Sequence, residues 1–449
     1  MEQRKKSPTD AVYQDDARES FVPWREPIHR HPSAEMTRTQ AWLLVGFLAV
    51  ALCLNNADRH AVFAIFPVLK SKLHFTDLQL GLTGSLFLWV YALCNPITGQ
   101  IGDRYSRKKL VALSLLLWSG ITALTGLATS PWMLLGCRGL LGVSESLFMP
   151  PAMALLASAH GPRSRSLATN VFGIGEYLGV VLGGTFGSLV AQRLHWRLTF
   201  FTFGALGLVY VIPYWGFLRG LREDHPPPVQ RGRKSLSIAS LVHVRSYWVL
   251  CAVFPVCVST VWLLYSWLPL FLYEKFSLTL AEAGFAATAY YQCSNLIGSL
   301  SGAALADRLY SRTRAARFWV AATGFLLGAP CLFFIGSSRS LFMTKVAIVG
   351  FGLFGGLFLS NLVVASFDVS PSHTRASACG CMNLLGSMSS GFASLAEGKW
   401  KQSLGIPNMM TLGAVASVAA ALLLMAAARS YFPRDHDWAR LEEAAYTPA

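Results

Sequence analysis

Long apolar runs separated by short polar links repeat along almost the whole chain after residue 40. Runs of about 20 apolar residues are long enough to cross a bilayer as helices. The pattern therefore predicts about twelve membrane spans. We place them at residues 41–66, 79–101, 109–128, 131–157, 167–190, 198–218, 246–270, 282–305, 318–335, 341–367, 377–399 and 409–430.

A polar, proline-bearing segment divides these spans into two halves. It covers residues 219–245 and contains Pro226, Pro227 and Pro228 beside a basic cluster. Such a composition favours a solvated linker. The predicted fold is an all-α integral membrane protein with two six-helix bundles, at 41–218 and 246–430. We expect residues 1–40 to be a disordered cytoplasmic tail and residues 431–449 to be a cytoplasmic tail.

Composition and charge agree with a membrane protein. Of 449 residues 53% are hydrophobic and 14% charged, and the net charge is +15. The cations gather in the links on one side of the spans, which is the positive-inside pattern, so we expect no nucleic-acid partner. The same asymmetry predicts both termini in the cytoplasm and a place in the plasma (inner) membrane. The nine cysteines show no metal-ligand spacing, so we expect no metal and no cofactor.

One short link between apolar runs is unusually rich in charge. Residues 99–110 combine an acid, two glycines and a cluster of cations, and a weaker version follows at residues 298–308. Plain positive-inside charge is one interpretation. It does not require the acid or the glycines, so a second role for this link stays open. Its candidate residues are Gly99, Gly102, Asp103, Arg104, Arg107, Asp307 and Arg308.

Charged side chains inside the predicted spans are the main candidates for function. A charge at the bilayer centre costs roughly 2.5–3.5 kcal/mol on insertion scales, so it needs a partner or a water-filled cavity. Counting from the span ends at about 1.5 Å per residue places Asp58 and Arg138 at one depth. Glu145 lies two turns beyond Arg138 on the same helix face. The complete set is Asp58, Arg59, Arg138, Glu145 and Glu176.

Two interpretations of this set stay open. In the first, Arg138 and Arg59 bind an anionic substrate, because a guanidinium can hold a carboxylate with two hydrogen bonds. Asp58, Glu145 and Glu176 are then proton carriers. In the second, the charges only link helices, and their loss disrupts folding.

Polar residues elsewhere in the spans are candidates for a central substrate cavity. Each of them can equally serve as a helix-packing hydrogen bond. They are Tyr91, Asn95, Tyr265, Tyr290, Gln292, Asn295, Asn361 and Asn383.

The link at residues 99–110 and the run Arg138-Gly-Leu-Leu-Gly-Val-Ser-Glu145 resemble motifs of the major facilitator superfamily. Within it, Asp58-Arg59 together with Arg138 and Glu145 is similar to the anion:cation symporter branch, and the spinster-like branch shares most of these features. The resemblance covers nearly the whole chain after residue 40. A Gly-Pro pair typical of drug:proton antiporters is missing from residues 167–190.

This resemblance implies a secondary transporter that works by alternating access. It also implies that the link at residues 99–110 is a gate that latches one conformation. We expect proton-coupled symport of a small organic anion, such as a sugar acid or carboxylate, by a monomer in the lipid bilayer. One alternative is a spinster-like exporter of a lysolipid or other amphiphile. Another is a non-transporting receptor with the same fold. No ATP-binding loop or nucleophile elbow is present in the sequence, so we expect no enzyme.

Overall fold

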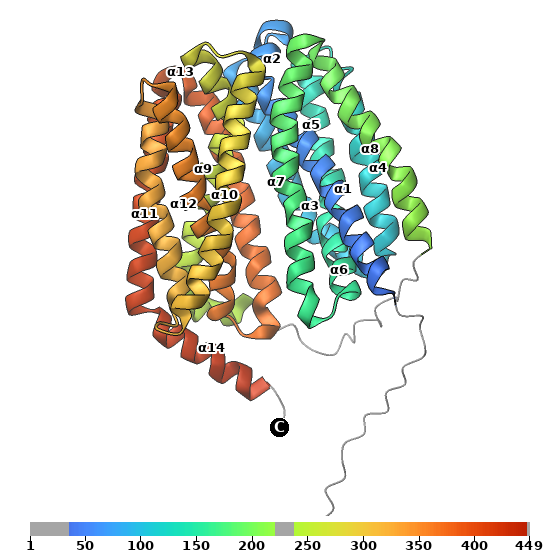
Figure 1. The fold of residues 1–449 in the computed structure, drawn as a ribbon. Helices are drawn as coiled ribbons and strands as arrows, with labels where there is room; N and C mark the ends of the chain where they lie inside the picture. The colour runs from blue at the N-terminus through green and yellow to red at the C-terminus, as the bar shows by residue number, and fades with distance from the viewer. Residues whose placement is uncertain (1–35, 221–237, 447–449) are drawn as a thin grey trace, which may run out of the picture.

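The computed structural model describes residues 36–220 and 238–446, and the elements of the N-terminal bundle gather on one side of it (Figure 1). One of these elements is a short helix, α2, at one end of the molecule (Figure 1). The predicted fourth span is divided into two helices, α5 and α6. Their bounds are α1 Arg38–Ala64, α2 Phe66–Leu73, α3 Asp77–Arg104, α4 Arg107–Thr125, α5 Pro131–Ser146, α6 Met149–Ala159, α7 Pro162–Arg193 and α8 Trp196–Arg219.

The C-terminal bundle lies beside the first and ends in a helix that runs beneath it (Figure 1). Within the described residues the chain has helices and no strand, as predicted. The bounds are η2 Ile238–His243, α9 Arg245–Phe276, α10 Leu280–Tyr310, α11 Ala316–Ser337, α12 Leu341–Asp368, η3 Ser372–Thr374, α13 Arg375–Ser430 and α14 Phe432–Tyr446. We call the two ends of the molecule the α2 end and the α14 end.

The eleventh and twelfth predicted spans form the two arms of α13, which meet at a kink at Gly405 with φ of 75°. Glycine suits this left-handed backbone because it has no Cβ. The predicted C-terminal tail contains the helix α14, which begins at Phe432. The predicted N-terminal tail lies mostly outside the described residues, and α1 already begins at Arg38.

Span four is interrupted directly after Glu145, where a continuous helix is expected from the sequence. α5 ends at Ser146 and α6 begins at Met149, ahead of Pro150 and Pro151. A proline has no N–H for the carbonyl four residues earlier, so the Ser146 carbonyl is freed. The Thr98 hydroxyl takes its place and donates to that carbonyl at 3.0 Å. The break is thus stabilised from α3.

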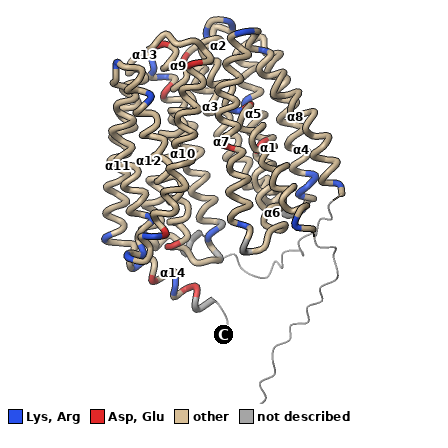
Figure 2. Tube along the Cα trace, in the orientation of Figure 1, with Lys and Arg blue, Asp and Glu red and all other residues tan. Residues whose placement is uncertain are grey.

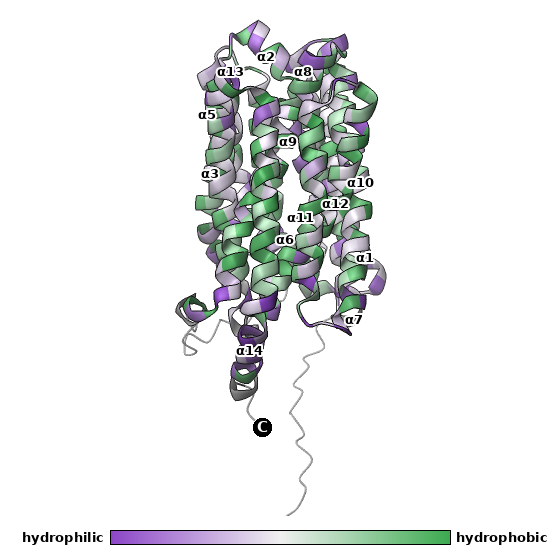
Figure 3. Cartoon of the chain, turned by 90° about the vertical axis from the view of Figure 1, so that its left-hand side faces the viewer, coloured by the Kyte–Doolittle hydropathy of each residue, from purple (hydrophilic) through white to green (hydrophobic). Residues whose placement is uncertain are grey.

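Surface composition fits a lipid environment. Ten described helical segments are long and apolar enough to cross a membrane, and the two arms of α13 count as one of them. Apolar colouring covers the long helices and polar colouring gathers near their ends (Figure 3). Lysine and arginine likewise concentrate near the two ends, and the middle of the bundles carries few charges (Figure 2).

The two bundles touch through their α2-end halves. α3 contacts α13 through hydrogen bonds from Ser394 Oγ to the Gly81 carbonyl at 3.0 Å and from Ser85 Oγ to the Gly391 carbonyl at 2.7 Å. The Trp89 indole donates to the Met388 carbonyl at 3.2 Å. Glycines allow this closeness, since a Cβ on Gly81 would lie 2.5 Å from the Ser394 carbonyl oxygen. We call this the α3–α13 contact.

Towards the α14 end the same two helices diverge. Leu93 follows Trp89 by one turn and Leu385 precedes Met388 by about one turn, so both continue the contact faces. They are nevertheless 60% and 37% exposed. The α3–α13 contact is therefore made at the α2 end and does not cover these two leucines towards the α14 end.

Candidate functional site

A salt bridge between α1 and α5 forms the centre of the candidate site. Arg59 Nε lies 2.9 Å from Glu145 Oε2, and Arg59 Nη2 bonds the same oxygen. Arg59 Nη2 also donates to Asn55 Oδ1 at 2.9 Å. The Arg59 side chain is 15% exposed, whereas that of Glu145 is fully buried. The guanidinium is thus held by Glu145 and Asn55 and remains partly accessible to solvent.

Aromatic rings of α3 form one wall beside Arg59. The guanidinium carbon lies 4.7 Å from the ring centre of Phe87 and 5.7 Å from that of Tyr91. Both distances fall within the range of cation–π attraction. This wall packs against the guanidinium, and the Arg59 side chain keeps a small exposed fraction of 15%.

Arg138 takes a different position from the one that its sequence suggests. It is 1% exposed, its Nε donates to the Thr83 carbonyl at 3.3 Å, and its Nη2 has no hydrogen-bond partner. Its charge interacts with Asp58 and Glu145, but within the described chain no carboxylate oxygen comes within 4.0 Å of it. Glu145 instead bonds Arg59. Arg138 is therefore enclosed by helices, while Arg59 holds the accessible positive charge.

The two buried acids each keep one unpaired oxygen. Asp58 Oδ2 accepts a hydrogen bond from the Thr122 hydroxyl at 2.8 Å, and Asp58 Oδ1 has no partner. Glu145 Oε1 is also buried without a partner. A buried unpaired carboxylate oxygen is costly, and a bound proton removes much of that cost. Both acids are therefore suited to proton binding.

Glu176 lies on α7 with an exposed side chain, in contrast to the other two acids. It interacts electrostatically with Arg59 across the bundle. Neighbouring glycines bring α7 against α1, since a Cβ on Gly175 would lie 2.2 Å from the Ala49 carbonyl oxygen. Glu176 is thus near the site but makes no direct bond to it in this conformation.

The polar candidates of the C-terminal bundle do not form one cluster. Gln292 Nε2 donates to Tyr265 Oη at 3.1 Å, and Gln292 Oε1 is buried without a partner. Asn295 bridges instead to the Gly352 carbonyl of α12 at 3.4 Å, which is a helix-packing role. Asn361 bonds the Leu357 carbonyl of its own helix at 2.8 Å.

Three further candidates are less central. Tyr290 faces Lys345, whose Nζ lies 5.6 Å from its ring centre. Asn383 is exposed and its amide contacts Cys379 Sγ at 3.3 Å. Asn95 is half-buried on α3, one turn beyond Tyr91.

His60 is a site residue that was not among the candidates from the sequence. It is 5% exposed, and its ring lies 4.7 Å from Tyr265 and 5.9 Å from Trp262, both of the other bundle. It therefore covers the site on the α2 side and joins the bundles there. A histidine directly after Asp58-Arg59 in an apolar run was the available signal.

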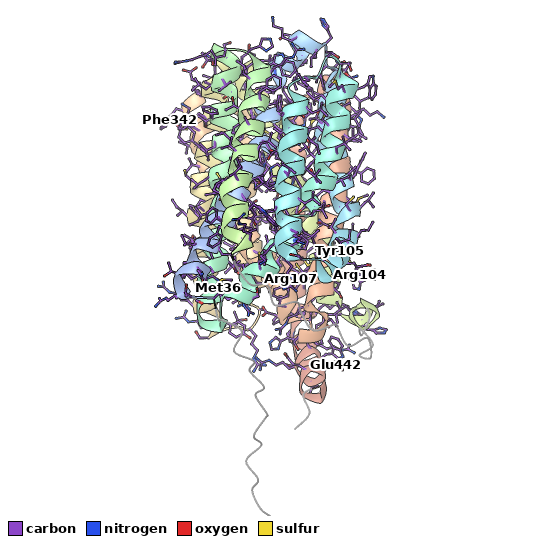
Figure 4. All side chains as sticks on the ribbon, turned by 90° about the vertical axis from the view of Figure 1, so that its right-hand side faces the viewer. Met36, Arg104, Tyr105, Arg107, Phe342 and Glu442 are labelled. Atoms are coloured by element: carbon purple, nitrogen blue, oxygen red, sulfur yellow. The ribbon has the colours of Figure 1, made fainter. Side chains whose placement is uncertain are left out.

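The predicted gate residues lie at the α14 end, where Figure 4 shows Arg104, Tyr105 and Arg107 close together. Gly102 is buried, and a Cβ there would lie 3.5 Å from Pro151, whereas Gly99 has open space. The side chain of Asp103 lies outside the described residues.

The corresponding link of the second bundle is held by a residue that was not among the candidates. Arg317 Nη1 bonds Asp368 Oδ1 at 2.6 Å, and Arg317 Nη2 lies 3.5 Å from Asp307 Oδ1. This arrangement ties α10, α11 and α12 together. Arg308 is exposed.

Comparison with known proteins identifies the family to which this arrangement belongs. A family model described as the Major Facilitator Superfamily matches residues 48–394 and 257–442. The chain belongs to the Major Facilitator Superfamily. It is therefore a multi-pass membrane transporter, and the predicted fold class is confirmed.

Two relatives in this superfamily cover most of the chain. The chain is 24% identical to a probable sulfoacetate transporter of Cupriavidus necator over 78% of this chain and 83% of the relative. It is 28% identical to an efflux pump of Mycolicibacterium smegmatis over 69% of this chain and 73% of the relative.

A solved structure shows the same fold at low sequence identity. It is a bacterial homologue of the human lysosomal transporter spinster, in an inward-facing and unoccupied conformation. The match has a TM-score of 0.73 and 20% identity, and covers 92% of this chain and all of the other chain.

Proposed function

We propose that this transporter carries a small organic anion together with protons. The observation that supports the anion is the Arg59 guanidinium, which is partly exposed, fixed by Glu145 and Asn55, and walled by aromatic rings. Such a guanidinium can present a pair of N–H groups to a carboxylate or sulfonate. The similarity to a probable sulfoacetate transporter supports the same class of substrate.

Exchange of partners at Arg59 provides a coupling mechanism. When the substrate carboxylate bonds Arg59, it competes with Glu145 for the same N–H groups. Glu145 then loses its counter-charge in a fully buried position, where an ionised carboxylate is costly. Proton uptake by Glu145 removes this cost, and Asp58 provides a second buried acid nearby. Substrate binding and protonation therefore favour each other.

We infer from the charges that the α14 end is cytoplasmic. Cations at that end include Arg104, Arg107, Lys108, Lys109, Arg165, Arg219, Arg245, Arg308, Arg312, Arg314, Arg317, Arg375, Arg429, Arg434 and Arg440. The α2 end has fewer cations, and an excess of Lys and Arg is typical of the cytoplasmic side. The closed α2 end and the diverging α14 end then correspond to an inward-open state.

A second candidate substrate is an amphiphile. The uncovered faces of α3 and α13 at the α14 end carry leucines and isoleucine, with Ile97 60% exposed and Leu384 37% exposed. Apolar walls of this kind suit an acyl chain. Arg59 could then bind the phosphate of a lysolipid.

A ligand screen separates these candidates. Purified protein is heated with sugar acids, sulfonates, dicarboxylates or lysolipids, and only a ligand of the native state raises the apparent stability. The best ligand is then tested for uptake into proteoliposomes with and without an inward proton gradient. We expect a small carboxylate or sulfonate to stabilise the protein and to accumulate only with the gradient. A best ligand without negative charge, or gradient-independent accumulation, would contradict the proposal.

A further inference from the structure

Glu397 is an acid in the membrane-spanning part of α13 that the site above does not use. Its Oε2 is buried and has no hydrogen-bond partner. It lines a groove of about 340 Å³ with walls that are mostly apolar, formed by α9 and the two arms of α13. The second arm contributes Met409, Leu412 and Gly413 to this groove and no titratable group.

Glu397 lies next to the residues that close the α2 end. Ser394 and Gly398, on either side of it in α13, contact α3 directly, and a Cβ on Gly398 would lie 2.5 Å from the Asp77 carbonyl oxygen. The helix therefore cannot move at the α3–α13 contact without moving Glu397. The groups around it are Trp267 of α9, whose indole faces the carboxyl group, and Lys401, one turn further along α13. Ser259 and Thr260 of α9 line the same groove.

Lys401 bridges the two bundles in the closed state. Its Nζ lies 3.5 Å from Asp77 Oδ1 of α3 and 2.9 Å from Glu274 Oε1 of α9. Asp77 also bonds Lys70 of α2 at 2.8 Å. Lys401 is thus engaged with two acids on the α2 side, and its Nζ lies 5.8 Å from the ring centre of Trp267.

Opening of the α2 end must separate Lys401 from Asp77. Glu397 and Lys401 are spaced i and i+4 with the acid first, the order that pairs best on a helix. A deprotonated Glu397 can therefore join Glu274, which is in the same bundle, as a partner of Lys401 when Asp77 is lost. When the end is closed, Lys401 has other partners, and an ionised Glu397 would be left buried and unpaired.

We propose that Glu397 is a proton-binding residue that controls closure of the α2 end. A proton from the water on that side binds the Glu397 carboxylate and breaks its pair with Lys401. The ammonium group of Lys401 then bonds Asp77 and Glu274, and the α3–α13 contact closes. This inference deepens the proposed proton coupling, and it rests on alternating access but not on the identity of the substrate.

The test measures opening of the α2 end directly and needs no ligand. Spin labels are attached at Ser71→Cys on α2 and Ser403→Cys on α13, in a background without the native cysteines. Their separation in lipid vesicles is followed from about pH 5 to about pH 8. One coupled proton changes the open-to-closed ratio by at most about tenfold per pH unit. We expect the long-distance population to grow as the pH rises.

Variants assign the response to Glu397. Glu397→Gln mimics the protonated form and should remain closed at every pH, while Glu397→Asp should still respond. Glu282→Gln is the control. It removes an exposed acid in the first turn of α10, at the α2 end of the molecule, and should respond to pH as the unchanged protein does. A pH response in Glu397→Gln equal to that of the unchanged protein, or no response in the unchanged protein, would overturn the inference. Failure of anion transport alone would leave this measurement unaffected.

Discussion

Arg59 and Glu145 are joined across two helices, at 2.9 Å from Nε to Oε2, although 86 positions separate them in the chain. Arg138 is the more deeply buried of the two arginines and bonds only a backbone carbonyl. The accessible and the enclosed arginine therefore have different roles. Their roles can be separated experimentally, because each can be changed to lysine with its charge retained.

The first prediction concerns these two arginines. Arg59→Lys should weaken binding of the anionic ligand by at least about tenfold, or about 1.4 kcal/mol, because a lysine cannot present the planar pair of donors. Arg138→Lys should keep binding within a few-fold but lower the thermal unfolding midpoint, because the ammonium loses the fit to the Thr83 carbonyl. Ligand titration and thermal unfolding of both purified variants measure these effects. The reverse pattern would make Arg138 the ligand-binding residue.

The second prediction concerns the acid that Arg59 holds. Glu145→Gln cannot exchange a proton, so gradient-driven accumulation in proteoliposomes should be lost. Counterflow exchange of labelled for unlabelled ligand needs no net proton movement and should continue. If both acids carry protons, Asp58→Asn should likewise lose accumulation and keep counterflow exchange. Normal accumulation by both variants under a proton gradient would remove these acids from the coupling mechanism.

Span positions were predictable because a helix that crosses lipid must be long and apolar, and such helices are visible in the sequence as long apolar runs. The predicted spans all correspond to helices in the structure, including α10 with its several polar residues. Local deviations were not predictable to the same degree. The break after Glu145 depends on the hydroxyl of Thr98 from another helix, and the turn within α13 depends on one left-handed glycine.

The composition of the charged site was predictable, but its pairing was not. Burial cost alone identifies Asp58, Arg59, Arg138 and Glu145 as special. The depth estimate counts residues along ideal helices and ignores the length of each side chain. It therefore does not predict that the long side chain of Arg59 extends to Glu145. His60 and Glu397 were not predicted because a single polar residue in an apolar run gives no pattern. The neighbours of His60 come from the other bundle, and those of Glu397 come from a groove between α9 and the arms of α13.

The third prediction tests closure at the α2 end through a glycine. A Cβ on Gly398 would lie 2.5 Å from the Asp77 carbonyl oxygen, so Gly398→Val should hold α3 and α13 apart. Gly380→Val is the matched control on the same helix, since nothing lies within 4 Å of a Cβ there. In a cysteine-free background, a thiol at Ser85→Cys should react quickly with a water-soluble reagent in Gly398→Val and slowly in the control. Equal rates would show that the contact tolerates the added side chain.

The last prediction concerns pH and the docking of α14. His436 is 3% exposed, with its ring 5.3 Å from that of Phe432. Burial lowers the pKa of His436 below its ordinary value, and the cations Arg440 and Arg314 lower that pKa further, against an opposing effect of Asp437. Undocked α14 therefore binds a proton more readily than docked α14. The resulting stabilisation is complete above the ordinary pKa of about 6.5 and is lost as the pH falls through the lowered value.

A spin label at Glu442→Cys, near the free end of α14 (Figure 4), reports this docking by its mobility. In the cysteine-free background we expect mobility to rise as the pH is lowered from about 7 to about 5. His436→Gln cannot take up the proton, so its label should stay equally mobile over that range. His243→Gln, which changes an exposed histidine at the same end, is the control and should keep the pH response. If the label in His436→Gln still responds like that of the unchanged protein, another group must control the docking of α14, because the only change removed the titration of His436.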